Sequence, residues 1–228
     1  MKLQLLRFQC DVDLAPGCVR TLQIEDHHVF ARVVESLASE KGLEAVEPYA
    51  LWDEAGKKVN PKKALLLLNS LPAVPYDDKA LLAKLYAYMR MQLENAPDAN
   101  EGVSQLAYGI LDALEAKALE LWGTYSFGED WSVEAFLKAF AFTPAINGDA
   151  MLLDRAIALF GLCADIGFQS PMVMVNAKSF FDAKELETLF QQAVFFGVRL
   201  LLLESHKDEM HYDIEQKVII DQDFLVVP

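Results

Sequence analysis

The stretch MVMVNAKSFFDAKELETLFQQAVFFGVRLLLLE, residues 172–204, decides the fold class. Its two ends, 172–176 and 198–204, are continuous apolar runs of the kind that form strands buried on both faces. Between them, Asp182 and Glu185 form a D-x-x-E capping box, and apolar residues then recur at three- and four-residue steps. Strand, helix and strand within about 30 residues make a βαβ unit, in which the strands pair in parallel. The sequence therefore predicts an α/β fold.

The N-terminal region predicts more strands and one helix. Pro16-Gly17 is expected to turn the chain between two strands, so that these form a hairpin. Asp26 is placed to cap a helix with an apolar face from Val29 to Leu37, and Gly42 to end it. Further strands are predicted at 3–9, 18–24 and 64–69, in a hairpin at 49–60, and as edge strands in the C-terminal segments 217–221 and 224–228.

The middle of the chain predicts a helical insertion. Residues 77–95 have the spacing of an amphipathic helix, and Ala96-Pro97-Asp98 interrupts it. A second helix with apolar residues from Val103 to Leu121 follows, and the short break predicts an antiparallel pair. We therefore expect a head domain with a mixed sheet, built from residues 1–75 and 140–228, and a helical leg at 76–139.

Composition limits the classes of function. The chain has 228 residues, 53% of them hydrophobic, and a formal net charge of −14. Its first residues do not have the pattern of a signal peptide and no apolar run is long enough to span a membrane, so no membrane partner is expected. The three cysteines show no C-x-x-C spacing, which indicates reduced thiols in a cytoplasmic protein. An acidic chain needs a local concentration of positive charge before it can bind nucleic acid.

Several catalytic patterns are missing. The sequence contains no G-x-x-x-x-G-K-[ST] phosphate loop, no G-x-G-x-x-G and no G-x-S-x-G, so we expect no enzymatic activity. The four histidines do not have the spacing of a metal pair, and zinc is not favoured. Carboxylates gather near the end of the second long helix and the loop after it. Oxygen ligands suit calcium or magnesium, but without a D-x-D-x-D-G loop a solvated acidic face is the better interpretation of Glu120, Glu129, Asp130 and Glu134.

Four lysines stand close together in a chain with excess acid: Lys57, Lys58, Lys62 and Lys63. One interpretation is an ordinary solvated turn. The other is a patch that contacts phosphates without reading base sequence. A single copy would attract DNA modestly, and several copies around one opening would produce a substantial field.

The chain resembles the Csn-two family of type II-A CRISPR adaptation proteins. The resemblance runs over most of the chain in the same order and is weakest at 123–149. It is carried by IEDHHVFARVVESL (24–37), LWDEAGKKVNPKKALLLLNSL (51–71), DKALLAKLYAYMRMQLE (78–94), VNAKSFFDAKELETLFQQAVFFGVRLLLLESHK (175–207) and QKVIIDQDFLVV (216–227).

This resemblance implies a head that is a degenerate phosphate-loop-ATPase-like domain, together with a helical leg. It implies a homotetrameric ring that threads the ends of double-stranded DNA through a lysine-lined hole during spacer acquisition. It implies calcium ions that stabilise the ring, and partnership with the CRISPR integrase proteins and the type II effector nuclease. DNA contact then falls on Lys57, Lys58, Lys62 and Lys63, and calcium on Glu120, Glu129, Asp130 and Glu134.

Two other functions are weighed against DNA-end binding. One is a nucleotide- or phosphate-binding α/β enzyme, which the missing phosphate loop argues against. The other is an acidic scaffold that binds only proteins, which would not retain linear duplex DNA.

Overall fold

The structure is a computed structural model that describes residues 1–74, 78–127, 130–146 and 149–227. The chain divides into two compact units. The first, called the sheet unit, joins Met1–Pro75 to Ile146–Pro228; the second, called the helical unit, is Tyr76–Ala145.

The sheet unit is built on a six-stranded mixed sheet, as predicted. Its strands lie in the order β10-β9-β3-β8-β7-β6, and every neighbouring pair is parallel except β10 with β9. The strands are β3 (Val19–Ile24), β6 (Leu66–Leu68), β7 (Met172–Val175), β8 (Leu200–Glu204), β9 (Glu215–Ile220) and β10 (Val226–Val227). The segment at 217–221 was predicted as an edge strand, which is wrong, because β9 lies between β3 and β10.

The predicted βαβ unit is confirmed. Strands β7 and β8 pair in parallel, with Val173 opposite Leu201. Helix α6 (Ala183–Phe195) connects them, and the Asp182 side chain accepts hydrogen bonds from the amides of Lys184 and Glu185. The Glu185 side chain accepts a hydrogen bond from the Asp182 amide, so the capping box is complete.

A second, antiparallel sheet corrects the prediction for the N-terminus. Strands β1 (Lys2–Leu5), β2 (Cys10–Asp13), β4 (Tyr49–Trp52) and β5 (Lys58–Val59) lie in the order β2-β1-β4-β5. Residues 3–9 were expected to form a hairpin with 18–24. Instead the chain turns at the short 3-10 helix Leu6–Phe8 and at Gln9, whose φ is 50°, so β1 pairs with β2. Strand β3 is thereby free to enter the large sheet.

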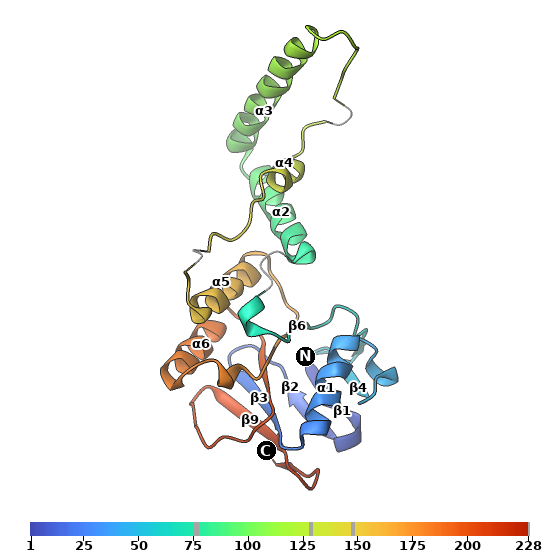
Figure 1. Cartoon of the computed structure of the whole chain (residues 1–228), viewed down its shortest axis with the longest axis vertical. Helices are drawn as coiled ribbons and strands as arrows, with labels where there is room; N and C mark the ends of the chain where they lie inside the picture. Colours follow the sequence, from blue (N-terminus) through green and yellow to red (C-terminus); the bar gives the residue numbers. More distant parts are fainter. Residues whose placement is uncertain (75–77, 128–129, 147–148, 228) are drawn as a thin grey trace. The chain divides into compact units, whose positions relative to one another are not determined.

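Buried apolar residues cover both faces of the large sheet. Figure 1 shows α1 (His27–Ser39) and the small sheet on one side, and α5 (Leu152–Asp165) and α6 on the other. Leu22 and Ile24 of β3 pack with Val29 and Val33 of α1 and with apolar residues of β1 in a single cluster. Three further 3-10 helices are Gly42–Glu44, Leu71–Ala73 and Ala177–Ser179.

The helical unit contains α2 (Lys79–Glu94), α3 (Pro97–Ala118) and α4 (Val133–Ala139). The predicted antiparallel pairing of the two long helices is wrong. Pro97 begins α3 immediately after α2, and in Figure 1 α3 continues beyond the end of α2 instead of folding back along it. Helix α4 contacts α2 instead, through an Arg90–Glu134 ion pair of 2.9 Å.

This arrangement leaves the apolar face of α3 uncovered. Among the described residues of α3, Ala107 is the one that is buried. Leu106 is 73% exposed, and Ile110 and Leu114 are each more than half exposed. No helix in the described ranges is both long and apolar enough to cross a membrane.

Truncation of Leu22 tests the shared core. Leu22→Ala should lower the free energy of unfolding by about 2–5 kcal/mol, because the side chain is fully buried and its removal leaves a cavity. Leu225→Ala, at a position that is 62% exposed, should change it by less than about 0.5 kcal/mol. Urea denaturation followed by circular dichroism measures both values, and equal effects would contradict the assigned core.

Candidate nucleic-acid interface

The predicted lysines lie on and beside the β4–β5 hairpin. The turn is organised by Asp53, whose Oδ1 accepts hydrogen bonds from the amides of Ala55 (3.0 Å) and Lys57 (2.8 Å). Gly56 occupies a left-handed conformation with φ 74°, which favours glycine. The turn thus presents Lys57 and Lys58, while Lys62 and Lys63 follow where the chain leaves β5 for β6.

All four lysine side chains are exposed to solvent. In the described part of the chain, none of their ammonium groups forms an ion pair within 4.0 Å. The charge of these side chains is therefore available to an external anion.

Lys41 is a fifth cation that the sequence alone did not single out. Together with Lys58 it lines a hollow of about 220 Å³, whose walls include Gly42, Tyr49 and Pro61. Gly42 is needed there, since its φ is +61° and an added Cβ would come within 2.9 Å of the Pro61 ring. No sequence signal separates Lys41 from other surface lysines, because only the tertiary fold brings the end of α1 beside β5. We call Lys41, Lys57, Lys58, Lys62 and Lys63 the lysine patch.

Two carboxylates lie at the margin of the lysine patch. Glu40 accepts a hydrogen bond from the backbone amide of Lys63 at 3.0 Å, and Glu44 lines the same hollow as Lys41. Lys63 itself has a positive φ of 58°. The Glu40 contact therefore fixes the backbone at Lys63 and leaves its ammonium group exposed.

The carboxyl edge of the large sheet is the usual ligand site of an α/β fold. Here the connection from β3 to α1 is Glu25-Asp26, and Asp26 accepts a hydrogen bond from the Val29 amide at 2.8 Å. That hydrogen bond lowers the pKa of Asp26. The helix start thus carries a carboxylate where a phosphate-binding fold presents free amides.

A buried ion cluster lies along one face of the large sheet. The Lys178 ammonium lies 2.6 Å from Glu215 and 2.8 Å from Asp208, and only 10% of its side chain is exposed. Thr21 of β3 donates a hydrogen bond to Glu215, and Gln23 donates one to Asp208. Burial disfavours the charged Lys178, but the hydrogen bonds to Asp208 and Glu215 outweigh it and raise its pKa.

Asp208 attaches the β8–β9 segment to the sheet. It lies 2.8 Å from Lys178 and 2.7 Å from Lys217. Partial burial acts to raise the pKa of Asp208, but hydrogen bonds from these two lysines outweigh it and lower the pKa. The cations of this cluster are therefore neutralised internally, in contrast to those of the lysine patch.

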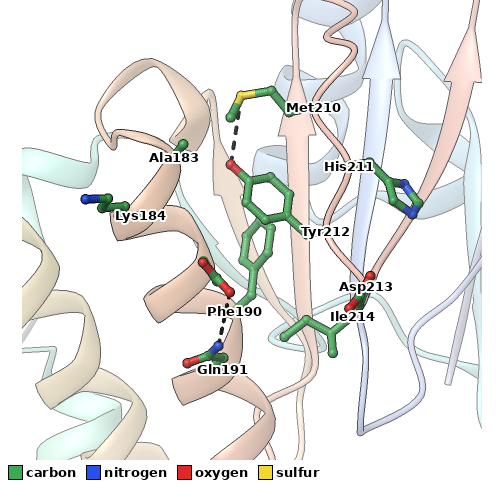
Figure 2. Close-up of a pocket in the computed structure, with 10 residues that line it drawn as sticks. Ala183, Lys184, Phe190, Gln191, Met210, His211, Tyr212, Asp213 and Ile214 are labelled. Carbon is green, nitrogen blue, oxygen red and sulfur yellow. Dashed lines mark hydrogen bonds between the residues drawn. The ribbon is translucent and has the colours of Figure 1, made fainter.

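A hollow of about 520 Å³ lies between α6 and the β8–β9 segment (Figure 2). Tyr212 packs against Phe190 of α6 with ring centroids 5.1 Å apart, and its hydroxyl donates to the Met210 sulfur. Lys184, Glu187 and Asp213 bring charges of both signs to the rim. This surface has no net preference for an anion.

The predicted calcium carboxylates are not gathered into one site in the described residues. Glu120 pairs with Lys117 at 2.7 Å, Glu134 pairs with Arg90, and Asp130 is exposed. Glu129 lies outside the described residues. No group of three or more possible metal ligands occurs within the described ranges.

Two histidines meet across elements. The rings of His27 at the start of α1 and His206 after β8 lie 5.5 Å apart, edge to face. The two histidines are far apart in the sequence, so the spacing of residues along the chain could not predict this contact. The described residues place no third metal ligand with them.

These features define a class: a two-unit α/β protein with a carboxylate-capped helix at the carboxyl edge of its large sheet and an exposed lysine patch outside that edge. The sequence model of the family described as CRISPR-associated protein (Cas_Csn2) matches residues 44–224. The chain belongs to this CRISPR-associated family.

A solved structure shows the same fold. The crystal structure of Stu0660 of Streptococcus thermophilus superimposes with a TM-score of 0.51 at 13% sequence identity, covering 97% of this chain and 75% of that one. No curated protein matches the sequence.

The buried Glu204 carboxyl predicts a pH dependence of stability. Burial raises its pKa from 4.5 to about 7, while the amide and ammonium of Lys178 oppose the shift. Between these pH values the folded chain binds a proton that the unfolded chain releases, so the contribution of Glu204 to stability falls as pH rises. Glu204→Gln keeps the acceptor and removes the titration.

Urea denaturation of both proteins between pH 5 and 8 measures this difference. The Glu204→Gln protein should gain stability relative to the wild type as pH rises, and most of the gain should come below pH 7. Asp208 becomes protonated only at a pH below its ordinary pKa, which lies outside the pH range of this experiment. Parallel curves for the two proteins would contradict the shifted pKa.

Proposed function

We propose that this protein binds the ends of double-stranded DNA without sequence specificity, as a homotetrameric ring acting in CRISPR spacer acquisition. The observation that carries the proposal is the lysine patch: five exposed cations in one region of a strongly acidic chain. Membership of the CRISPR-associated family supports the biological setting. The CRISPR integrase proteins and the type II effector nuclease are the proposed partners, in the cytoplasm.

The net charge of −14 makes the assembly necessary for binding. A single patch faces repulsion from the rest of the chain, and this repulsion is screened over about 8 Å at physiological salt. Several patches that face one opening act together within that distance on the same duplex. The proposed ring therefore turns a modest local potential into a binding field.

The uncovered apolar face of α3 supports self-association. Leu106, Ile110 and Leu114 repeat at four-residue steps on one side of the helix and are more than half exposed. A contiguous apolar face of this kind is usually covered by a partner. We assign a second copy of the chain as that partner, in keeping with the ring implied by the family resemblance.

Calcium is proposed on the family resemblance alone. Glu120 and Glu134 each have a basic partner within the same chain, so the described residues do not form a site around one ion. No part of the proposed DNA contact requires calcium. We propose that calcium stabilises the ring.

We also propose that the protein is not an enzyme and that its sheet unit is a degenerate relative of phosphate-loop ATPases. The Asp26 cap supports this, since the protein's own carboxylate occupies the helix start at which a phosphate would bind. The competing function, a phosphate-transfer enzyme, requires measurable ATP turnover by the purified protein.

Removal of the predicted lysines tests the DNA contact. Replacing Lys57, Lys58, Lys62 and Lys63 with Ala should abolish retention of linear duplex DNA in gel shifts. Any residual binding should depend less on salt concentration, because fewer phosphates are contacted and fewer counterions are released. A matched variant replaces four other exposed lysines, Lys79, Lys138, Lys184 and Lys207, and lowers the net charge equally. Equal weakening by the two variants would refute the lysine patch.

Charged substitutions on α3 test the ring. Leu106→Asp with Leu114→Asp should reduce the assembly size measured by analytical ultracentrifugation. DNA can enter a closed protein ring only from a free DNA end. The same change should therefore remove the preference of the wild type for linear over closed circular DNA. Gln105→Asp adds a charge at an exposed polar position of α3 and should change neither the assembly size nor the preference for linear DNA. An unchanged assembly size in the double variant would rule out this face as the contact.

A further inference from the structure

We propose that Trp52, on the outer face of the small sheet, is a stacking site for an unpaired nucleobase at the DNA end. This inference rests on the proposed DNA function and adds a second chemistry to it. The lysine patch would hold the backbone, and the indole would hold a base that has left the duplex.

Strand register places Trp52 between two lysines. In the antiparallel pair β4–β5, Trp52 lies opposite Lys58, and in the pair β1–β4 it lies opposite Lys2. Residues directly opposite each other in an antiparallel pair project their side chains from the same face of the sheet. Each neighbouring strand therefore places a lysine beside Trp52 on the same face of the sheet. The Lys2 ammonium is paired with Asp11 of β2, so the Lys58 ammonium is the one without an ion pair.

The indole is fixed in place and partly open. Its Nε1–H donates a hydrogen bond to Oε1 of Gln4 on β1 at 3.3 Å, and the side chain is half-buried. It lines a hollow of about 820 Å³ together with Lys2, Gln4 and Gly56. A ring held by a hydrogen bond at its edge, with space beside it, is suited to accept a planar partner on its face.

The carboxylates around this hollow are already engaged. Asp11 pairs with Lys2 at 2.8 Å, and Glu54 pairs with Arg199 at 2.8 Å. Asp13 lies 3.7 Å from Arg20, and Asp53 accepts the two turn amides described above. Among the described side chains of this region, Lys57, Lys58 and Asp53 have no ion pair, and their charges sum to a net positive one. The surroundings of Trp52 therefore favour an anionic ligand over a cationic one.

An aromatic ring beside lysines is the usual arrangement for binding single-stranded nucleic acid. Every base has a flat π surface, so stacking on a side chain tolerates any sequence. The ammonium groups of Lys57 and Lys58 would meanwhile contact the neighbouring phosphates. A base paired within a duplex offers no open face, whereas an overhanging end does. The ligand class is thus a single-stranded extension of a DNA end.

The test compares two DNA ends with the full-length protein. Fluorescence anisotropy measures binding to a blunt duplex and to the same duplex with a short thymidine overhang. The wild type should bind the overhang more tightly, and Trp52→Leu should lower overhang affinity by about 5- to 150-fold while blunt affinity stays unchanged. Trp52→Phe should keep most of the preference, and Trp122→Leu, which removes a fully exposed indole of the helical unit, should keep all of it.

Indole fluorescence gives a direct readout. Overhang DNA should quench the emission of the wild type more than blunt DNA does, and this difference should vanish in Trp52→Phe although binding persists. Equal binding of both ends by the wild type, or an unchanged overhang preference in Trp52→Leu, would overturn the stacking site and leave the lysine patch standing. Failure of the wild type to bind any DNA would overturn both proposals.

Discussion

Parallel pairing of β3 with β8 on one side and β9 on the other is the constraint on which the sheet unit depends. A central strand has both faces covered, so each of its side chains must find a matching environment. Leu22 and Ile24 enter the apolar cluster with α1 and the small sheet. Thr21 and Gln23 are equally buried and require polar partners, which Glu215 and Asp208 supply.

This requirement also separates the buried, paired charges from the exposed ones. Lys178 and Lys217 satisfy the acids beneath β3, so their ammonium groups are not available to a ligand. These ion pairs lie along the face of the sheet, and the helix start at its carboxyl edge carries the Asp26 carboxylate. The lysine patch lies instead on and beside the small antiparallel sheet, one face of which packs on the core while the other is in water.

The charge distribution follows the same division. The chain is acidic overall, and acidic side chains neutralise many of its cations in pairs such as Lys2–Asp11 and Arg199–Glu54. The lysine patch differs because its carboxylate neighbours, Glu40 and Glu44, lie at its margin and Glu40 binds backbone. Local pairing, more than net charge, therefore determines which surface of this protein is able to approach a polyanion.

The sequence by itself determined the α/β class, the capped helices α1 and α6, the parallel β7–β8 pair and the lysine cluster, because each is a short-range pattern of apolar period or charge. The tertiary structure alone decided that β1 pairs with β2 and β4, that α3 runs on from α2, and that Lys41 joins Lys58. It also brought Trp52 between Lys2 and Lys58, and Lys178 to Glu215. All of these features depend on contacts between residues that are distant in the chain. The free energy of such contacts comes from burial and from charge pairing, and neither can be read from a short segment of sequence.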